Sequence, residues 1–154
     1  MLGLSRRGAI AAAVAAASVA AIPASLAQRV DDYARTAGVI TIYLGVLPAE
    51  IVKGHPMMLG GAPAGPHEYH VVAAIFDATG AARISDASVT AKVSGLGLSG
   101  SEKTLEQMNI ASTITYGGFF YLPGADLYTI RVSVRHRGSQ QPVVFDFKYD
   151  HRRR

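Results

Sequence analysis

The chain has 154 residues, no cysteine and a formal net charge of +4. This length fits one domain, and the lack of cysteine excludes disulfides and thiolate metal sites. Much of the positive excess lies near the two ends, in Arg6–Arg7 and Arg152–Arg154. No basic cluster carries the aromatic partners that nucleic-acid binding needs, so we expect no nucleic-acid partner.

The N-terminal segment has the pattern of a secretory signal peptide. Arg6–Arg7 precede an apolar run from Gly8 to Ile22, and a small-x-small cleavage pattern ends at Ala27. We therefore predict a signal peptide over residues 1–27. The apolar run is short for a membrane span, so we expect no span after cleavage, and an uncleaved anchor is the less favoured alternative. The arginine pair is compatible with both the general secretory route and the twin-arginine route.

The chain then divides into a tether over residues 28–38, one β domain over 39–150 and a solvated basic tail over 151–154. The first strand is predicted at Val39–Leu47, which is apolar and rich in β-branched residues. Pro48 to Pro66 is rich in proline and glycine and is predicted to hold no regular element. A loop of this length in a small domain is usually functional or disordered.

The rest of the domain reads as short strands separated by turns. They are predicted at Tyr69–Phe76, Ser88–Ser94, Lys103–Ile110, Tyr116–Leu122, Tyr128–Arg135 and Val143–Asp150. About seven strands with no convincing helix predict an all-β, immunoglobulin-like β-sandwich. Tyr128 follows a glycine-containing turn and opens a late strand, which is the place of a tyrosine corner.

Histidine and methionine side chains gather around the Pro48 to Pro66 loop. The candidate metal ligands are His55, Met57, Met58, His67, His70 and, from a distant strand, Met108. Imidazole nitrogen and thioether sulfur suit copper, above all Cu(I). Residues three apart in a strand point to opposite faces, so His67 and His70 share a metal only if His67 precedes the strand. The alternative is that the methionines fill gaps at the edge of the core.

Catalysis finds little support in the sequence. There is no nucleophile-elbow or zinc-protease motif, and the acidic residues of the domain are scattered. We therefore predict that the protein is not an enzyme. A metal-free, immunoglobulin-like interaction module of the cell envelope is the main alternative to a metal-binding protein, with the Pro48 to Pro66 loop meeting a protein partner.

From His67 to Tyr149 the sequence resembles the bacterial periplasmic iron-transport protein family. The resembling segments are His67–His70, the turn Asp77–Gly80, Gln107–Met108 with Ala111, Tyr116–Gly117, Gly124–Tyr128 and Phe145–Tyr149. The resemblance implies a small immunoglobulin-like protein of the periplasm that binds copper or another divalent metal and supports ferrous-iron uptake.

The resemblance also implies a ligand set. A histidine ligand of the family corresponds to His67 or His70, and a methionine ligand corresponds to Met108. A second histidine ligand, just before Tyr-Gly, corresponds to Thr115, which is a departure because threonine is a poor ligand for a soft metal. The segment from His55 to Met58 is a candidate source of substitute ligands.

We therefore predict a periplasmic metal-binding protein that carries or buffers copper and is linked to iron uptake, with iron as the alternative cargo. Its expected partners are the metal ion and an envelope transporter or metal acceptor protein. The sequence is compatible with a monomer and with a homodimer.

Overall fold

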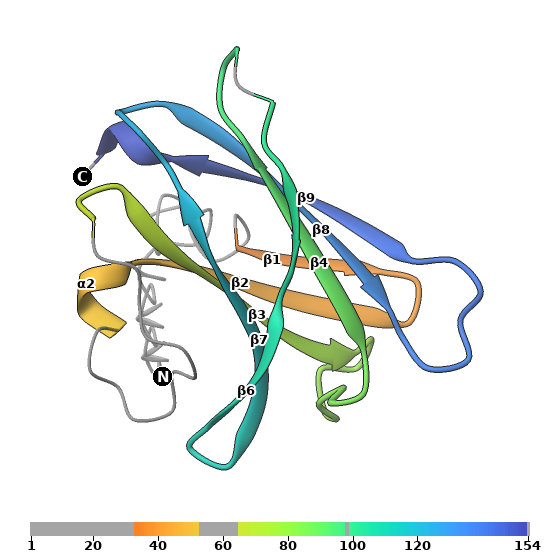
Figure 1. Ribbon diagram of the computed structural model, residues 1–154. Coiled ribbons are helices and arrows are strands. Elements are labelled where there is room, and N and C mark those ends of the chain that lie inside the picture. The colour runs from red at the N-terminus through yellow and green to blue at the C-terminus, as the bar shows by residue number, and fades with distance from the viewer. Residues whose placement is uncertain (1–32, 53–64, 98, 154) are drawn as a thin grey trace, which may run out of the picture.

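The computed structural model describes residues 33–52, 65–97 and 99–153 (Figure 1). The predicted signal peptide and the candidate ligands His55, Met57 and Met58 lie outside these residues. In the part of the chain that is described, no helix has the length and apolar character needed to cross a membrane.

Two antiparallel sheets pack face to face, which confirms the predicted all-β, immunoglobulin-like sandwich. The five-stranded sheet has the order β1-β2-β3-β7-β6, and the four-stranded sheet has the order β5-β4-β8-β9. The strands are β1 Ala34–Ala37, β2 Ile40–Pro48, β3 Glu68–Asp77, β4 Ser88–Ser94, β5 Glu102–Thr104, β6 Glu106–Ile110, β7 Thr113–Tyr121, β8 Leu127–Arg135 and β9 Val143–Asp150.

The core forms where alternate residues of both sheets point inward. In β8 the side chains of Tyr128, Ile130, Val132 and Val134 are buried, as the period of two in the sequence predicts. The hydroxyl of Tyr128 donates a hydrogen bond of 2.9 Å to the carbonyl oxygen of Pro123. This bond ties the start of β8 to the turn before it and matches the tyrosine corner that was expected there.

The chain changes sheets at Leu105. The sequence predicts one weak strand at Lys103–Ile110, but β5 pairs with β4 and β6 pairs with β7 in the other sheet. Leu105 lies between the two strands and is only 2% exposed, and its N–H donates to the carbonyl oxygen of Val89 at 2.9 Å. The corner therefore places Met108 on the edge strand of the five-stranded sheet.

The segments directly before and after β2 were expected to be irregular, but both form regular structure. Within the predicted tether, Ala34–Ala37 form β1 and pair with β2 through a tight turn in which Gly38 has a φ of 58°. Within the predicted loop, Ala49–Val52 form the short helix α2, which packs against β3. β1 is therefore stabilised by its hydrogen bonds to β2, and α2 by its packing on β3.

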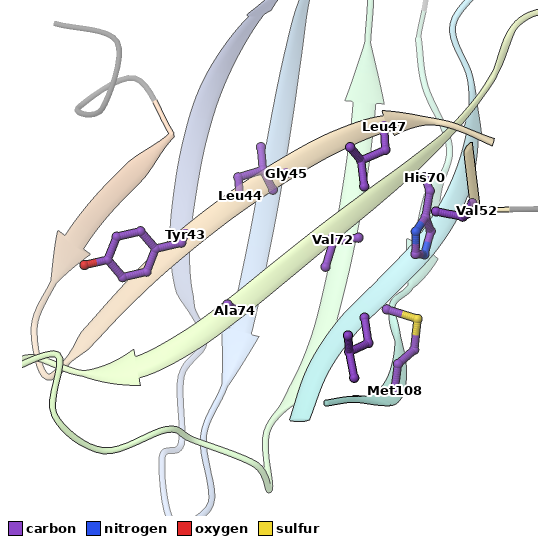
Figure 2. A pocket seen from close by; sticks show the side chains of 10 residues that line it. Tyr43, Leu44, Gly45, Leu47, Val52, His70, Val72, Ala74 and Met108 are labelled. Carbon is purple, nitrogen blue, oxygen red and sulfur yellow. The ribbon is translucent and has the colours of Figure 1, made fainter. Parts of the chain in front are cut away.

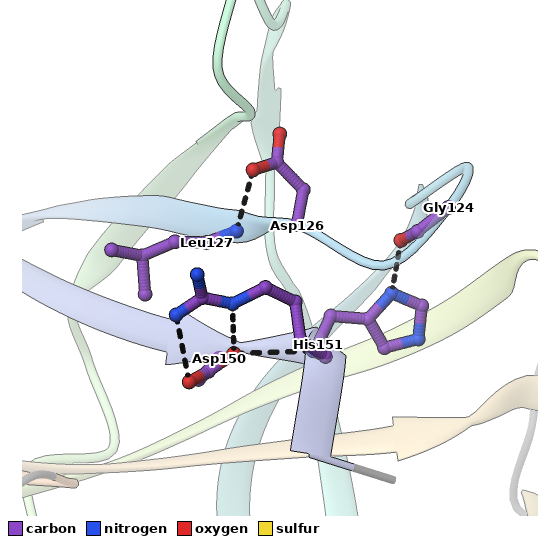
Figure 3. Close-up of polar contacts among 6 residues, drawn as sticks. Gly124, Asp126, Leu127, Asp150 and His151 are labelled. Atoms are coloured by element: carbon purple, nitrogen blue, oxygen red, sulfur yellow. Dashed lines mark hydrogen bonds and ion pairs between the residues drawn. The ribbon is translucent and has the colours of Figure 1, made fainter.

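His151, expected to belong to a solvated tail, is held at the end of the sandwich (Figure 3). It opens the 3-10 helix η1, His151–Arg153. Its Nδ1–H donates to the carbonyl oxygen of Gly124 at 2.6 Å, and its Nε2 lies 2.7 Å from the hydroxyl of Tyr69. The ring of Tyr149 stacks on the histidine ring with a centroid distance of 5.9 Å. The chain end is thus tied to the beginning of β3.

Candidate metal site

His70 lies on the outer face of the five-stranded sheet but is almost completely buried. Its neighbours Tyr69 and Val71 in β3 point into the core, so the ring of His70 points the other way. The ring is nevertheless only 1% exposed. Phe119, its partner on β7, stacks on it with a centroid distance of 4.7 Å, and Val52 of α2 lies beside it (Figure 2).

The buried ring of His70 lacks the hydrogen bond that a buried polar group normally has. Its Nδ1 has no hydrogen-bond partner among the described residues. Burial also lowers the pKa of His70 below the usual value, because desolvation disfavours the charged imidazolium. His70 is therefore held as a neutral base with a lone pair, which is the form that binds a metal ion.

Met108 meets His70 above Gly117. The residues lie on three strands: β3 carries His70, β7 carries Gly117 and β6 carries Met108. A Cβ atom built on Gly117 would lie 2.5 Å from His70 Nε2 and 2.5 Å from Met108 Cε. The imidazole and the thioether of two distant segments therefore converge on the same small space (Figure 2).

Thr115 shares this face of the sheet. It is the cross-strand partner of Met108, and its Oγ1 is buried with no hydrogen-bond partner among the described residues. The three positions that the family resemblance singles out, His70, Met108 and Thr115, are thus gathered on one face. The hydroxyl of Thr115 is an oxygen donor, so His70 and Met108 are the two soft donors that the described residues bring to this face.

His67 has a different aromatic neighbour from His70. It precedes β3, as sharing a metal with His70 requires, and its ring packs edge-on against Tyr121 with a centroid distance of 5.8 Å. It does not line the cavity to which His70 and Met108 contribute. Within residues 33–52, 65–97 and 99–153, no three histidine, aspartate or glutamate side chains group into a metal cluster.

A groove of about 410 Å³ extends from His70 and Met108 across the sheet (Figure 2). We call it the outer groove; it is lined by Tyr43, Leu44, Gly45, Leu47, Val52, His70, Val72, Ala74, Met108 and Ile110. Sequence reasoning missed this feature. Its signal is the apolar outward positions of β3, since a strand with one solvated face would alternate apolar and polar residues.

His70 makes a specific contribution to the pH dependence of stability. Unfolded, it takes up a proton as the pH falls through its ordinary value of 6.5, whereas in the folded protein it stays neutral until its lower pKa is reached. We therefore expect its contribution to the free energy of unfolding to be full above pH 6.5 and to decrease between 6.5 and the folded pKa. Urea unfolding across this range should show a shallower pH dependence in His70→Gln. The same pH dependence in the parent protein and in His70→Gln would contradict the lowered pKa of His70.

Solved structures with a similar fold include copper-bound proteins. A DUF4426 family protein from Pseudomonas aeruginosa PAO1 has a TM-score of 0.62 and 13% identity, with 76% of this chain and 91% of that chain covered. A copper-bound variant of FetP from uropathogenic Escherichia coli strain F11 has a TM-score of 0.58 and 16% identity, with 76% of this chain and 92% of that chain covered. Copper-reconstituted P19 from Campylobacter jejuni has a TM-score of 0.57 and 14% identity, with 76% of this chain and 91% of that chain covered.

The chain has the fold of FetP and P19. The resemblance inferred from the sequence motifs is therefore confirmed for the fold, and at these identities the similarity concerns the fold alone. No model of a known protein family matches the sequence, and no curated protein matches it.

Proposed function

We propose that the protein is a periplasmic metal-binding protein that carries or buffers copper through His70 and Met108. The observation that carries this proposal is the buried imidazole of His70. Its Nε2 faces the space above Gly117 that Met108 shares, and its Nδ1 has no hydrogen-bond partner among the described residues. A neutral imidazole and a thioether are donors that suit copper.

Two further observations support copper and the periplasm. The structures of FetP and P19 that share this fold were obtained with copper bound. The signal-peptide pattern over residues 1–27 predicts export, and FetP was produced in the periplasm for one of its structures. A role in iron uptake, and transfer of the cargo to an envelope transporter or acceptor protein, rest on the family resemblance. In this proposal the protein is a carrier and not an enzyme.

The outer groove favours a second candidate function. Tyr43, Leu47 and Ile110 line it with 46%, 40% and 38% of their surface exposed. Contiguous exposed apolar side chains often mark a protein interface. A metal-free interaction module of the cell envelope would use this face for a protein partner and would leave His70 and Met108 without a metal.

The two functions are separated by titration of the mature protein with Cu(I) against a chromogenic Cu(I) chelator under anaerobic, reducing conditions. We expect the protein to withdraw Cu(I) from the chelator. The double variant His70→Ala/Met108→Ala should compete far less, because both soft donors are absent. Failure of the parent protein to compete would favour the interaction module. Equal competition by the double variant would show that the donors lie elsewhere in the chain.

A further inference from the structure

A carboxylate, that of Glu106, lies on the same face of the sheet as His70 and Met108. β6 pairs Glu106 directly with Gly117 of β7. Tyr116 points into the core, so Gly117 and its cross-strand partner Glu106 face outward, and Met108, two residues along β6, faces the same way. Opposed side chains of an antiparallel pair begin about 5 Å apart, and Gly117 has no side chain to separate Glu106 from the two soft donors.

An ion held by these donors lies on the solvent side of Gly117. The position of the missing Cβ is already filled, because it lies 2.5 Å from His70 Nε2 and 2.5 Å from the methyl carbon of Met108. His70 is 1% exposed, Met108 is half-buried and Glu106 is exposed. The long, exposed side chain of Glu106 can therefore bring its oxygen atoms to an ion from the side on which the ion enters.

The carboxylate of Glu106 is not engaged by another side chain in the part of the chain that the structure describes. The ion pairs there join β8 to β9 and lie near the C-terminus, and neither involves Glu106. The nearby ammonium group of Lys103 donates instead to the carbonyl oxygen of Phe119 at 2.9 Å. No basic side chain thus competes with a cation for this carboxylate.

A carboxylate changes which ion the site can hold. His70 and Met108 are neutral donors, so on their own they leave the whole charge of a bound ion uncompensated, which is costly near an apolar surface. One negative charge close to the ion offsets part of that cost, and it attracts a divalent ion more strongly than a monovalent one. Thioether sulfur favours Cu(I), whereas carboxylate oxygen is a harder donor. The carboxylate of Glu106 should therefore stabilise Cu(II) more than Cu(I).

We infer that Glu106 is the third metal-binding residue of the site, and that its carboxylate allows the site to hold copper as Cu(II) as well as Cu(I). This inference rests on the proposed function, in which His70 and Met108 hold the metal.

Two other carboxylates provide matched controls. Glu102 is exposed like Glu106 but belongs to β5, in the other sheet, so Glu102→Gln removes the same charge far from the soft donors. Glu68 is on the outer face, two residues before His70 in β3, but β7 separates β3 from β6. Glu68→Gln therefore tests whether any carboxylate of this face is sufficient.

The test measures Cu(II) binding by competition with nitrilotriacetate, and the binding of Ag(I), a redox-stable substitute for Cu(I), by calorimetry. His70→Ala defines the Cu(II) binding that occurs elsewhere in the chain. We expect Glu106→Gln to weaken the His70-dependent Cu(II) binding about 10- to 100-fold, the range for an outer-shell partner and hence a lower limit for a ligand. Ag(I) binding should stay nearly unchanged, and both control variants should bind the two ions as the parent protein does.

Electron paramagnetic resonance of the Cu(II)-loaded proteins gives a second readout. The g values and the copper hyperfine splitting should differ between the parent and Glu106→Gln, because an amide replaces a charged oxygen ligand. A purely structural role of Glu106 would leave this spectrum intact in folded protein. Glu106 is exposed, so its exchange should have little effect on folding.

Three outcomes would overturn the inference: an unchanged Cu(II) affinity and spectrum in Glu106→Gln, a loss of Cu(II) binding in Glu68→Gln in place of Glu106→Gln, or an equal loss in Glu102→Gln. In each case, Cu(I) and Ag(I) binding by the parent protein would leave the proposed function intact. If the parent binds neither Cu(I) nor Ag(I), the proposed function fails together with the inference.

Discussion

Replacing Met108 by leucine is expected to weaken Cu(I) binding about 100-fold, because the loss of a direct donor should cost at least as much as the loss of an outer-shell partner. Leucine keeps the volume and the apolar character of methionine, and such exchanges usually cost little stability. Met108 is half-buried on an edge strand, which further limits the structural effect of the exchange. The measurement is the same anaerobic competition with a chromogenic chelator, supported by urea unfolding of the metal-free proteins.

The pH dependence separates the two donors. A thioether has no proton to exchange near neutral pH, so the factor lost in Met108→Leu should be the same at every pH at which the protein is folded. The affinity of His70 for copper should decrease at acidic pH because protons compete for the imidazole. Burial lowers the pKa of His70, so this decrease should begin at a lower pH than for a solvent-exposed histidine. In His70→Ala the pH dependence should be reduced.

The control for Met108→Leu is Ile110→Leu. Ile110 is on the same strand, faces the same outer groove and carries no donor atom, so its replacement should leave Cu(I) affinity unchanged. If Met108→Leu also retains the parent affinity, the sulfur donor is not Met108. Met57 and Met58, which lie outside the described residues, would then be the next methionines to replace.

The strands with a regular alternation are those that sequence reasoning placed best. β4 and β9 have the predicted bounds, and β8 differs by one residue, because a period of two in hydrophobicity directly records which face is buried. The corner at Leu105 was missed because a single buried leucine in a polar segment gives no periodic signal. β1 was missed because its pairing with β2 depends on a turn and not on apolar residues of its own.

The candidate site could be predicted by residue type but not by arrangement. Histidine and methionine can be recognised in the sequence as possible metal ligands. That His70 and Met108 lie close together depends on the register of β3, β7 and β6, which the sequence does not show directly. Gly117 contributes through the side chain that it does not have, so the sequence marks it only as part of the Tyr116–Gly117 segment of the resemblance and not by any chemistry of its own. The predicted grouping of His67 with His70 was a matter of sequence proximity, and the structure gives these two rings different aromatic neighbours.

Leu105→Ala is expected to lower the free energy of unfolding by about 2 to 5 kcal/mol, the range for removing a buried leucine side chain from a core. Leu105 joins the two sheets: its N–H bonds to Val89 of β4, and its Cδ2 lies 3.0 Å from the position of a Cβ at Gly118 of β7. Its side chain is buried in the core between the two sheets, so its removal would leave a cavity there. Urea unfolding monitored by tyrosine fluorescence measures the change.

Leu96→Ala is the matched control, because Leu96 is 86% exposed and the same substitution should change the free energy of unfolding by less than about 0.5 kcal/mol. Equal stability losses in the two variants would contradict the role of Leu105 at the corner.

The position of Leu105 also links stability to the site. β6 begins directly after it and pairs with no strand other than β7 among the described residues, so a loosened corner should shift Met108 relative to His70. We therefore expect folded Leu105→Ala, but not Leu96→Ala, to bind Cu(I) more weakly than the parent protein.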